Sequence, residues 1–315
     1  MGDLFFEGDA ALFWVSAVCL AAFVRLLLLR RSALARTSLA HAWRWLLISV
    51  IPIALMQLCH LNKDQIAPGV LNGSEWLAGV MLMTAPIAVL GARRPGARAW
   101  PWFVVLPLII VLLWPAVSEL LSNRGREPLT AGTPALMGFV IAGLMGFGNF
   151  FGTRNTLSAM FYFTAVAFPL LPVAGYRDQF WLSPLFSAPA LLVSGLLADH
   201  RYQTLVQVPK GSAFEAANRL WLIFRDFFGI VWAKRVMDRM NLFAARERWT
   251  VTLTLDGFLC GAVDSSLESC AVDNAAMKRP VETLVWLLRR FADTEWLQEQ
   301  LDPFGTGATT ETIDV

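Results

Sequence analysis

The side chains of this sequence that could hold a cofactor are three histidines and four cysteines. His41 and His200 are expected near the same membrane face, and two facing histidines are what a bis-histidine haem requires. Haem-binding bundles usually hold such ligands within their helices, whereas these two lie near predicted helix ends, so haem binding is the weakest alternative. The sequence contains no HExxH and no CxxC spacing. We therefore predict no metal site and no cofactor.

A second group of candidates lies in a glycine-rich run that contains Gly143, Gly148, Asn149 and Gly152 and is followed by Arg154. Gly148 and Gly152 form a GxxxG pattern, and small residues at this spacing let two membrane helices pack closely. Close helix packing is the favoured interpretation. The functional alternative is that the glycines thin the helix and leave a pocket or hinge with Asn149 and Arg154 at its floor.

A third group combines an aromatic stripe with basic residues on one predicted helix, namely Trp221, Phe224, Phe228 and Trp232, followed by Arg235 and Arg239. Such a surface could dock a protein partner or contact anionic headgroups. The favoured alternative for the stripe is packing within the C-terminal region, and for the arginines a solvated helix face. Residues 202–315 carry twelve Lys and Arg against fifteen Asp and Glu, a net charge of −3, which disfavours nucleic acid as a partner.

The elements that position these groups follow from composition. Hydrophobic residues make up 56% of the chain and charged residues 16%, with a mean hydropathy of +0.54. This balance excludes an ordinary soluble enzyme, a disordered chain and a disulfide-rich secreted module. The partner predicted first is therefore the lipid bilayer.

Seven apolar stretches are long enough to cross about 30 Å of hydrocarbon as helices. They are residues 10–29, 43–61, 75–92, 100–121, 134–152, 156–174 and 180–198. The middle third of each predicted span contains no Asp, Glu, Lys, Arg or His. Ion-coupled transporters usually hold an ionisable group there, so this pattern disfavours ion-coupled transport, and the lack of a lysine in the spans excludes a retinal Schiff base.

Positive charge in the loops predicts the orientation. One set of alternate loops and their flanks holds nine Lys and Arg residues and the other holds four, which places the N-terminus outside and the C-terminus in the cytoplasm. Arginine outnumbers lysine 22 to 4, which is typical of a GC-rich bacterial genome. We therefore expect a multi-pass protein of the bacterial inner membrane.

The predicted fold is an all-α polytopic membrane bundle of seven transmembrane helices with a small cytoplasmic α+β C-terminal domain. The domains are the bundle (1–201), a linker (202–211), the α+β domain (212–302) and a flexible tail (303–315). A capping box at Ser212 and Glu215 begins a helix that extends to about residue 246. Alternating residues at 249–255 predict a strand, residues 258–260 a second strand, and Pro280 begins a final helix to about residue 301.

No motif specifies a reaction, so the function predicted first is an integral membrane accessory or scaffold subunit. Its cytoplasmic domain would dock a partner protein, without catalysis. The second hypothesis is a permease or channel for a neutral or lipophilic solute, because prolines and glycines interrupt the helices. The third is a membrane haem protein or enzyme.

Overall fold

The computed structural model describes residues 2–92, 99–123, 125–176, 182–207, 212–260 and 274–301. The chain is mostly helical and carries one small two-stranded sheet. Its elements are α1 (Gly2–Leu29), α2 (Arg31–Ala35), α3 (Ala40–Leu61), α4 (Pro68–Leu90), α5 (Ala99–Asn123), α6 (Thr133–Gly148), α7 (Thr156–Ala167), the 3₁₀ turn η1 (Phe168–Leu170), α8 (Leu182–Val206), α9 (Ala213–Phe228), α10 (Ile230–Glu247), β1 (Val251–Thr254), β2 (Gly257–Cys260), α11 (Asn274–Leu288) and α12 (Thr294–Leu301).

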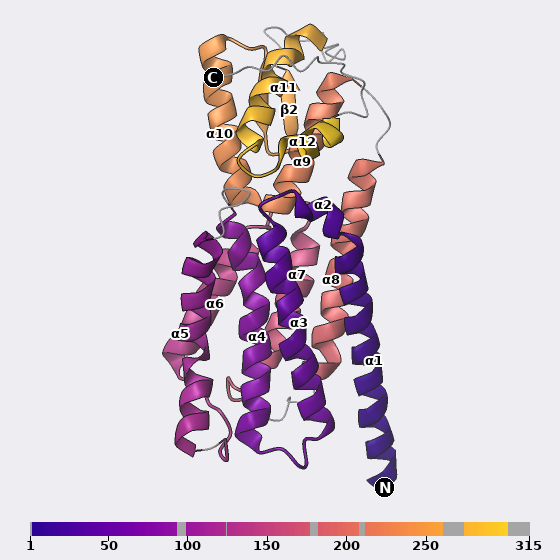
Figure 1. The fold of residues 1–315 in the computed structure, drawn as a ribbon, viewed down its shortest axis with the longest axis vertical. Coiled ribbons are helices and arrows are strands. Elements are labelled where there is room, and N and C mark those ends of the chain that lie inside the picture. The colour runs from indigo at the N-terminus through magenta and orange to yellow at the C-terminus, as the bar shows by residue number, and fades with distance from the viewer. Residues whose placement is uncertain are drawn as a thin grey trace.

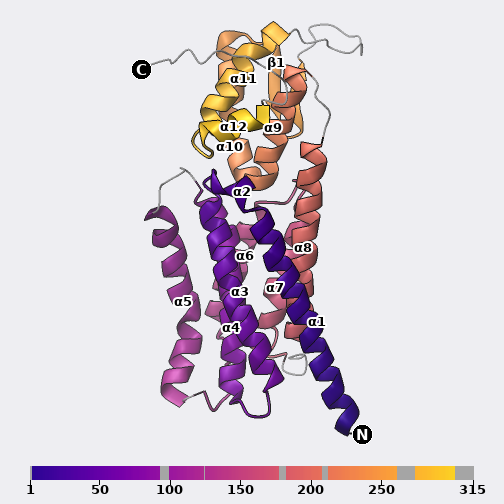
Figure 2. The ribbon, with the colours of Figure 1, turned by 45° about the vertical axis from the view of Figure 1, so that its right-hand side comes forward.

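Helices α1 and α3 to α8 form an elongated bundle, and α9 to α12 with the sheet lie across one of its ends (Figure 1). We call residues 212–301 the C-terminal segment, the bundle end that it covers the segment end, and the opposite end the far end. The N-terminus lies at the far end (Figures 1 and 2). Among the described residues, four helices are long and apolar enough to cross a membrane: Ala11–Leu29, Ala40–Leu61, Pro68–Leu90 and Trp102–Ser122. Two shorter apolar helices cover Thr133–Gly148 and Thr156–Leu170.

Helix α4 is the central helix of the bundle. In the most apolar stretch of α4, 83% of the residues are buried, against 17% in the corresponding stretches of α1 and α5. The outer helices expose large apolar side chains, for example Val18 on α1, Val111 on α5 and Leu144 on α6. In water such a surface would be unfavourable, so this distribution is compatible with a bundle surrounded by lipid.

Some helices are longer and others shorter than the predicted spans, for reasons that can be identified in the structure. Helix α4 begins at Pro68, a favoured first helical residue, seven positions before the predicted start at Glu75. Helix α6 ends at Gly148 instead of residue 152, because residues 149–155 form a turn in which Gly152 has a φ of +82°. Regular α-helix in α7 ends at Ala167, just ahead of Pro169.

The C-terminal segment contains the predicted mixture of helices and a β-hairpin. Ser212 and Glu215 form the expected capping box, and β1 pairs with β2 antiparallel, from Val251 opposite Cys260 to Thr254 opposite Gly257. The single helix predicted over 212–246 was wrong, because the chain breaks at Gly229 into α9 and α10.

Two other boundaries also differ from the prediction. The predicted linker 202–211 begins as helix, since α8 continues to Val206, and its residues 208–211 lie outside the described residues, as does the predicted tail 303–315. The final helix predicted over 280–301 is two helices, α11 and α12, with Pro280 inside the first.

Candidate functional site: the junction and the cavity beside it

The contact between the bundle and the C-terminal segment centres on Asn149, at the end of α6. Its side-chain Nδ2 donates to the Phe228 carbonyl (2.9 Å), and its Oδ1 accepts from the Val231 amide (3.0 Å). Its backbone carbonyl accepts from the Ile230 amide (2.6 Å). Asn149 therefore supplies the hydrogen bonds that the break at Gly229 removes from the helix. We call this contact the junction.

Gly229 is required at the junction by both space and backbone conformation. Its φ and ψ are 79° and 178°, a region that is accessible almost only to glycine. A Cβ built there would overlap with Asn149 Nδ2. Asn149 is 2% exposed, so water does not replace these contacts. The structure thus gives Asn149 a docking role, and the predicted pocket floor at this residue is a helix-to-segment contact.

A second contact joins the connection between α1 and α3 to the turn between α11 and α12. The Ser38 amide donates to the Phe291 carbonyl (2.8 Å), and the Asp293 amide donates to the Arg36 carbonyl (2.9 Å). The Trp296 indole donates to the Ala33 carbonyl (3.0 Å). One hydrophobic core is continuous across both contacts and joins residues of α3, α4 and α5 to residues of α9, α10 and α11. The junction is therefore not the single point of attachment between the described parts of the C-terminal segment and the bundle.

The aromatic stripe predicted to dock a partner is buried. Trp221, Phe224, Phe228 and Trp232 are 0%, 2%, 1% and 5% exposed, and Phe291 packs against three of them. These side chains cannot contact a separate partner, so that part of the site prediction is corrected in favour of internal packing. The Trp232 indole also donates to the Val89 carbonyl of α4 (3.1 Å), so the stripe contacts this chain's own bundle.

Arg235 and Arg239 remain available, because both are exposed on α10. The Arg235 guanidinium lies 4.8 Å from the centre of the Trp232 ring. The predicted contact of these two arginines with headgroups stays a prediction.

The glycines of α6 do not act through the predicted GxxxG pair. A Cβ at Gly148 would meet no atom within 4 Å, and Gly152 lies beyond the end of the helix. Close packing occurs instead at Gly143, where a Cβ would lie 3.3 Å from Met83, and at Gly146, where it would lie 3.0 Å from Pro86. Close packing, the favoured interpretation, therefore holds for Gly143 and for Gly146, and neither of these residues belongs to the predicted GxxxG pair.

A cavity of about 290 Å³ lies beside the junction, between the helices at the segment end. Its walls come from α1, α2, α3, α4, α7 and α8, with Phe147 and Phe150 at and just beyond the end of α6 and Asp226 and Phe227 from α9. Most of the lining is apolar, and Leu27, Leu46 and Ala159 are typical of it. An apolar cavity with a few placed polar groups is the usual form of a small-molecule site.

Polar groups also line this cavity near the segment end. Arg30, between α1 and α2, and Asp199 of α8 form an ion pair, and Gln203 donates to the second oxygen of Asp199 (2.6 Å). The Arg30 guanidinium lies 5.8 Å from the centre of the Tyr202 ring, and burial raises the pKa of the Tyr202 hydroxyl. These partners leave the Arg30 charge locally balanced.

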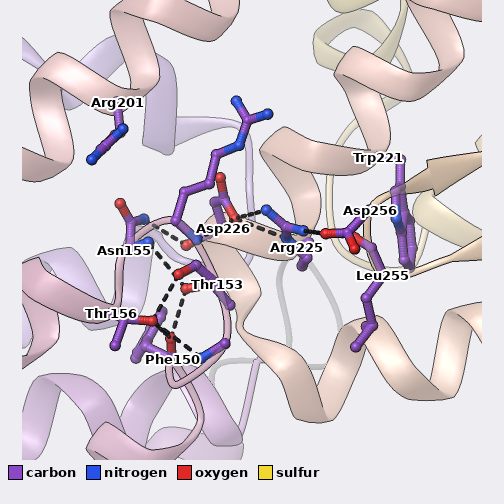
Figure 3. A network of polar contacts seen from close by, with 12 residues as sticks. Phe150, Thr153, Asn155, Thr156, Arg201, Trp221, Arg225, Asp226, Leu255 and Asp256 are labelled. Atoms are coloured by element: carbon purple, nitrogen blue, oxygen red, sulfur yellow. Dashed lines mark hydrogen bonds and ion pairs between the residues drawn. The ribbon is translucent and has the colours of Figure 1, made fainter.

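Asp226 is the centre of a network of polar contacts beside the cavity (Figure 3). Its Oδ1 accepts from the Arg225 guanidinium (2.9 Å) and from the Arg154 amide (3.3 Å), and its carbonyl accepts from Asn155 Nδ2 (2.8 Å). Arg225 extends the network to Asp256 (3.1 Å). Burial raises the pKa of the Asp226 carboxyl, while Arg225 opposes that rise. Arg154 was predicted to lie with Asn149 at the floor of a pocket. In the structure its backbone amide contacts Asp226, which lines the cavity beside the junction.

A separate buried pair lies toward the far end. Glu75 of α4 is 0% exposed, its Oε1 lies 2.8 Å from His60 Nε2, and its Oε2 accepts from Asn72 (3.1 Å). Gln57 donates to Ser16 of α1 in the same part of the bundle (2.7 Å). The predicted span began at Glu75, whereas Glu75 lies seven residues inside α4. The bundle therefore contains a buried carboxylate that the predicted span had placed at its end.

The structure does not support the two histidines that were predicted as possible haem ligands. His200 is exposed, His41 is only half-buried, and neither lines the cavity, so they do not form the buried pair that a haem requires. In the part of the chain that the structure describes, no group of three or more His, Cys, Asp and Glu side chains could hold a metal ion.

Comparison of the chain with protein-family models, with curated proteins and with solved structures finds no match.

Proposed function

We propose that the chain crosses the membrane seven times, with the N-terminus outside and the C-terminal segment in the cytoplasm. Three further helices, α6, α7 with η1, and α8, lie beside the four that are long and apolar enough to span. An odd number of spans agrees with the N-terminus and the C-terminal segment lying at opposite ends of the bundle (Figure 1). Arg30, Arg31 and Arg36 lie at the segment end, where the positive-inside rule places cytoplasmic charge.

The function that the geometry supports best is binding of a small lipophilic molecule, as the solute site of a membrane permease. The observation that carries this proposal is the cavity of about 290 Å³, with a mostly apolar lining and polar groups at the segment end. Such a site is suited to a molecule that partitions into the bilayer, because the bilayer concentrates it beside the helices. The buried stripe removes the docking surface on which the scaffold hypothesis first rested.

Filling the cavity tests the proposal. Ala159 on α7 is 7% exposed and lines the cavity, whereas Leu157 on the same helix is 49% exposed on the outer surface. The purified protein in phosphatidylcholine nanodiscs should bind radiolabelled octan-1-ol saturably in equilibrium dialysis, above protein-free nanodiscs. Ala159→Phe should abolish the saturable component, and the matched Leu157→Phe should retain it. Equal binding by both variants, or none by the native protein, would refute the proposal.

The accessory or scaffold subunit is the second candidate, and one observation favours it. Leu242, Leu259 and Trp286 expose 69%, 56% and 49% of their surface on α10, β2 and α11 of the C-terminal segment. A photocrosslinking amino acid at Leu242 in native membranes should then capture one specific protein, and the same probe at the exposed Arg246 should capture less. Identical products at both positions would count against this candidate.

A further inference from the structure

Two buried oxygen atoms belong to residues that line the cavity and lack a hydrogen-bond partner among the described residues. They are Oδ2 of Asp226 and Oδ1 of Asn155, and neither has a partner among the residues that the structure describes. Both atoms are buried, both residues line the cavity, and Asp226 as a whole is 3% exposed. Asn155 Nδ2 already donates to the Asp226 backbone carbonyl, which places the Asn155 side chain against Asp226 (Figure 3).

A buried hydrogen-bond acceptor without a donor is unfavourable. The two unpaired oxygens therefore indicate which groups a ligand must supply. The ligand must donate hydrogen bonds, and two separate acceptors need two donors from one end of the molecule. A primary ammonium offers three N–H groups on one atom, whereas an alcohol offers one O–H. A carboxylate offers none and would lie against the carboxylate of Asp226.

We propose that the cavity binds an amphiphile with a primary amine head, whose ammonium contacts Asp226 Oδ2 and Asn155 Oδ1. This inference rests on the proposed function and names its ligand class. The ion pair of Arg30 with Asp199 balances the other charges of the lining, so the ammonium would face the carboxylate of Asp226. That carboxylate already pairs with Arg225 through its other oxygen and lies near the charge of Arg154. The apolar part of the ligand would lie against side chains such as Leu27 and Leu46.

The cavity volume guides the choice of chain length for a probe ligand. A cavity of about 290 Å³ holds about ten non-hydrogen atoms at roughly 30 Å³ each, which is the share of one water molecule in the liquid. Octylamine is close to this size. The same ammonium chemistry has two sources, a free alkylamine or the ethanolamine head of a phospholipid.

The test compares octylamine, octan-1-ol and octanoate on the native protein in phosphatidylcholine nanodiscs, whose choline heads carry no N–H donor. We expect saturable octylamine binding at least tenfold tighter than that of octan-1-ol, and none of octanoate. Asp226→Asn should weaken octylamine binding at least tenfold and leave octan-1-ol unchanged. The control is Asp238→Asn, at an exposed carboxylate paired with Lys234 on α10, and it should change neither.

The outcomes separate this inference from the proposed function. Equal affinity for octylamine and octan-1-ol would overturn the amine head and leave the lipophilic site standing, while saturable binding of none of the three would overturn both. This ranking needs only the native protein, so it decides the question even if Asp226→Asn does not fold. Nanodiscs that contain phosphatidylethanolamine should compete with octylamine if the lipid is the source, and should not compete if a free amine is.

Discussion

The contact of Asn149 with the break at Gly229 allows a quantitative prediction. Asn149→Ala removes two side-chain hydrogen bonds, to the Phe228 carbonyl and from the Val231 amide, and keeps the bond from its own carbonyl to Ile230. Each lost bond costs about 1 kcal/mol, and more where the remaining group stays buried, so opening of the junction should become easier by about 2–4 kcal/mol. At about 1.4 kcal/mol per factor of ten, this is a change of roughly 30- to 700-fold.

Hydrogen exchange measures that opening directly, because the Val231 amide exchanges only when its bond to Asn149 breaks. The matched control is Asn241→Ala. Asn241 makes the same two kinds of bond, to the Leu253 carbonyl and from the Leu253 amide (both 2.8 Å), but entirely within the C-terminal segment. The control should speed exchange at Leu253 and leave Val231 protected. If Asn149→Ala changed protection at Val231 less than about fivefold, the two side-chain bonds of Asn149 would not be what holds the junction closed.

Three further outcomes are expected. Gly229→Ala should destabilise the protein by about 3 kcal/mol or more, seen as a lower thermal midpoint in nanodiscs, because it forces a strained backbone and a contact with Asn149. Trp232→Phe should cost about 1–2 kcal/mol by removing the bond to the Val89 carbonyl, and a loss below about 0.3 kcal/mol would contradict that role. Since burial holds the pKa of Asp226 above 3.8, the folded state binds this proton more tightly than the unfolded chain. Its contribution to stability should fall as pH rises from 3.8 through the folded pKa, and Asp226→Asn should remove that component from a pH series of thermal midpoints.

Features that depend on local sequence could be predicted. The capping box at Ser212 and the alternating residues of β1 each act within a few positions, and both were confirmed. Four spans are likewise supported by length and composition, while the total of seven remains a proposal.

Features that depend on distant contacts could not be predicted. The break at Gly229 is compensated by Asn149, 80 positions earlier in the sequence, so helical periodicity alone favoured one continuous helix. The aromatic stripe indicated helical structure, which the chain forms as two helices, but it left the packing partner ambiguous, because a face that packs on the chain's own bundle has the same spacing as one that binds another protein. The unpaired oxygens of Asp226 and Asn155 carry no sequence signal at all.

The cavity walls also set an order of assembly. Phe23 on α1 and Phe227 on α9 line the same space, yet 204 positions separate them along the chain. At about 5–20 residues per second, a ribosome needs roughly 10–40 s to synthesise the chain from Phe23 to Phe227. Throughout that interval the insertion machinery handles helices whose shared cavity lacks the wall that α9 provides, and a chain truncated before α9 would lack that wall permanently.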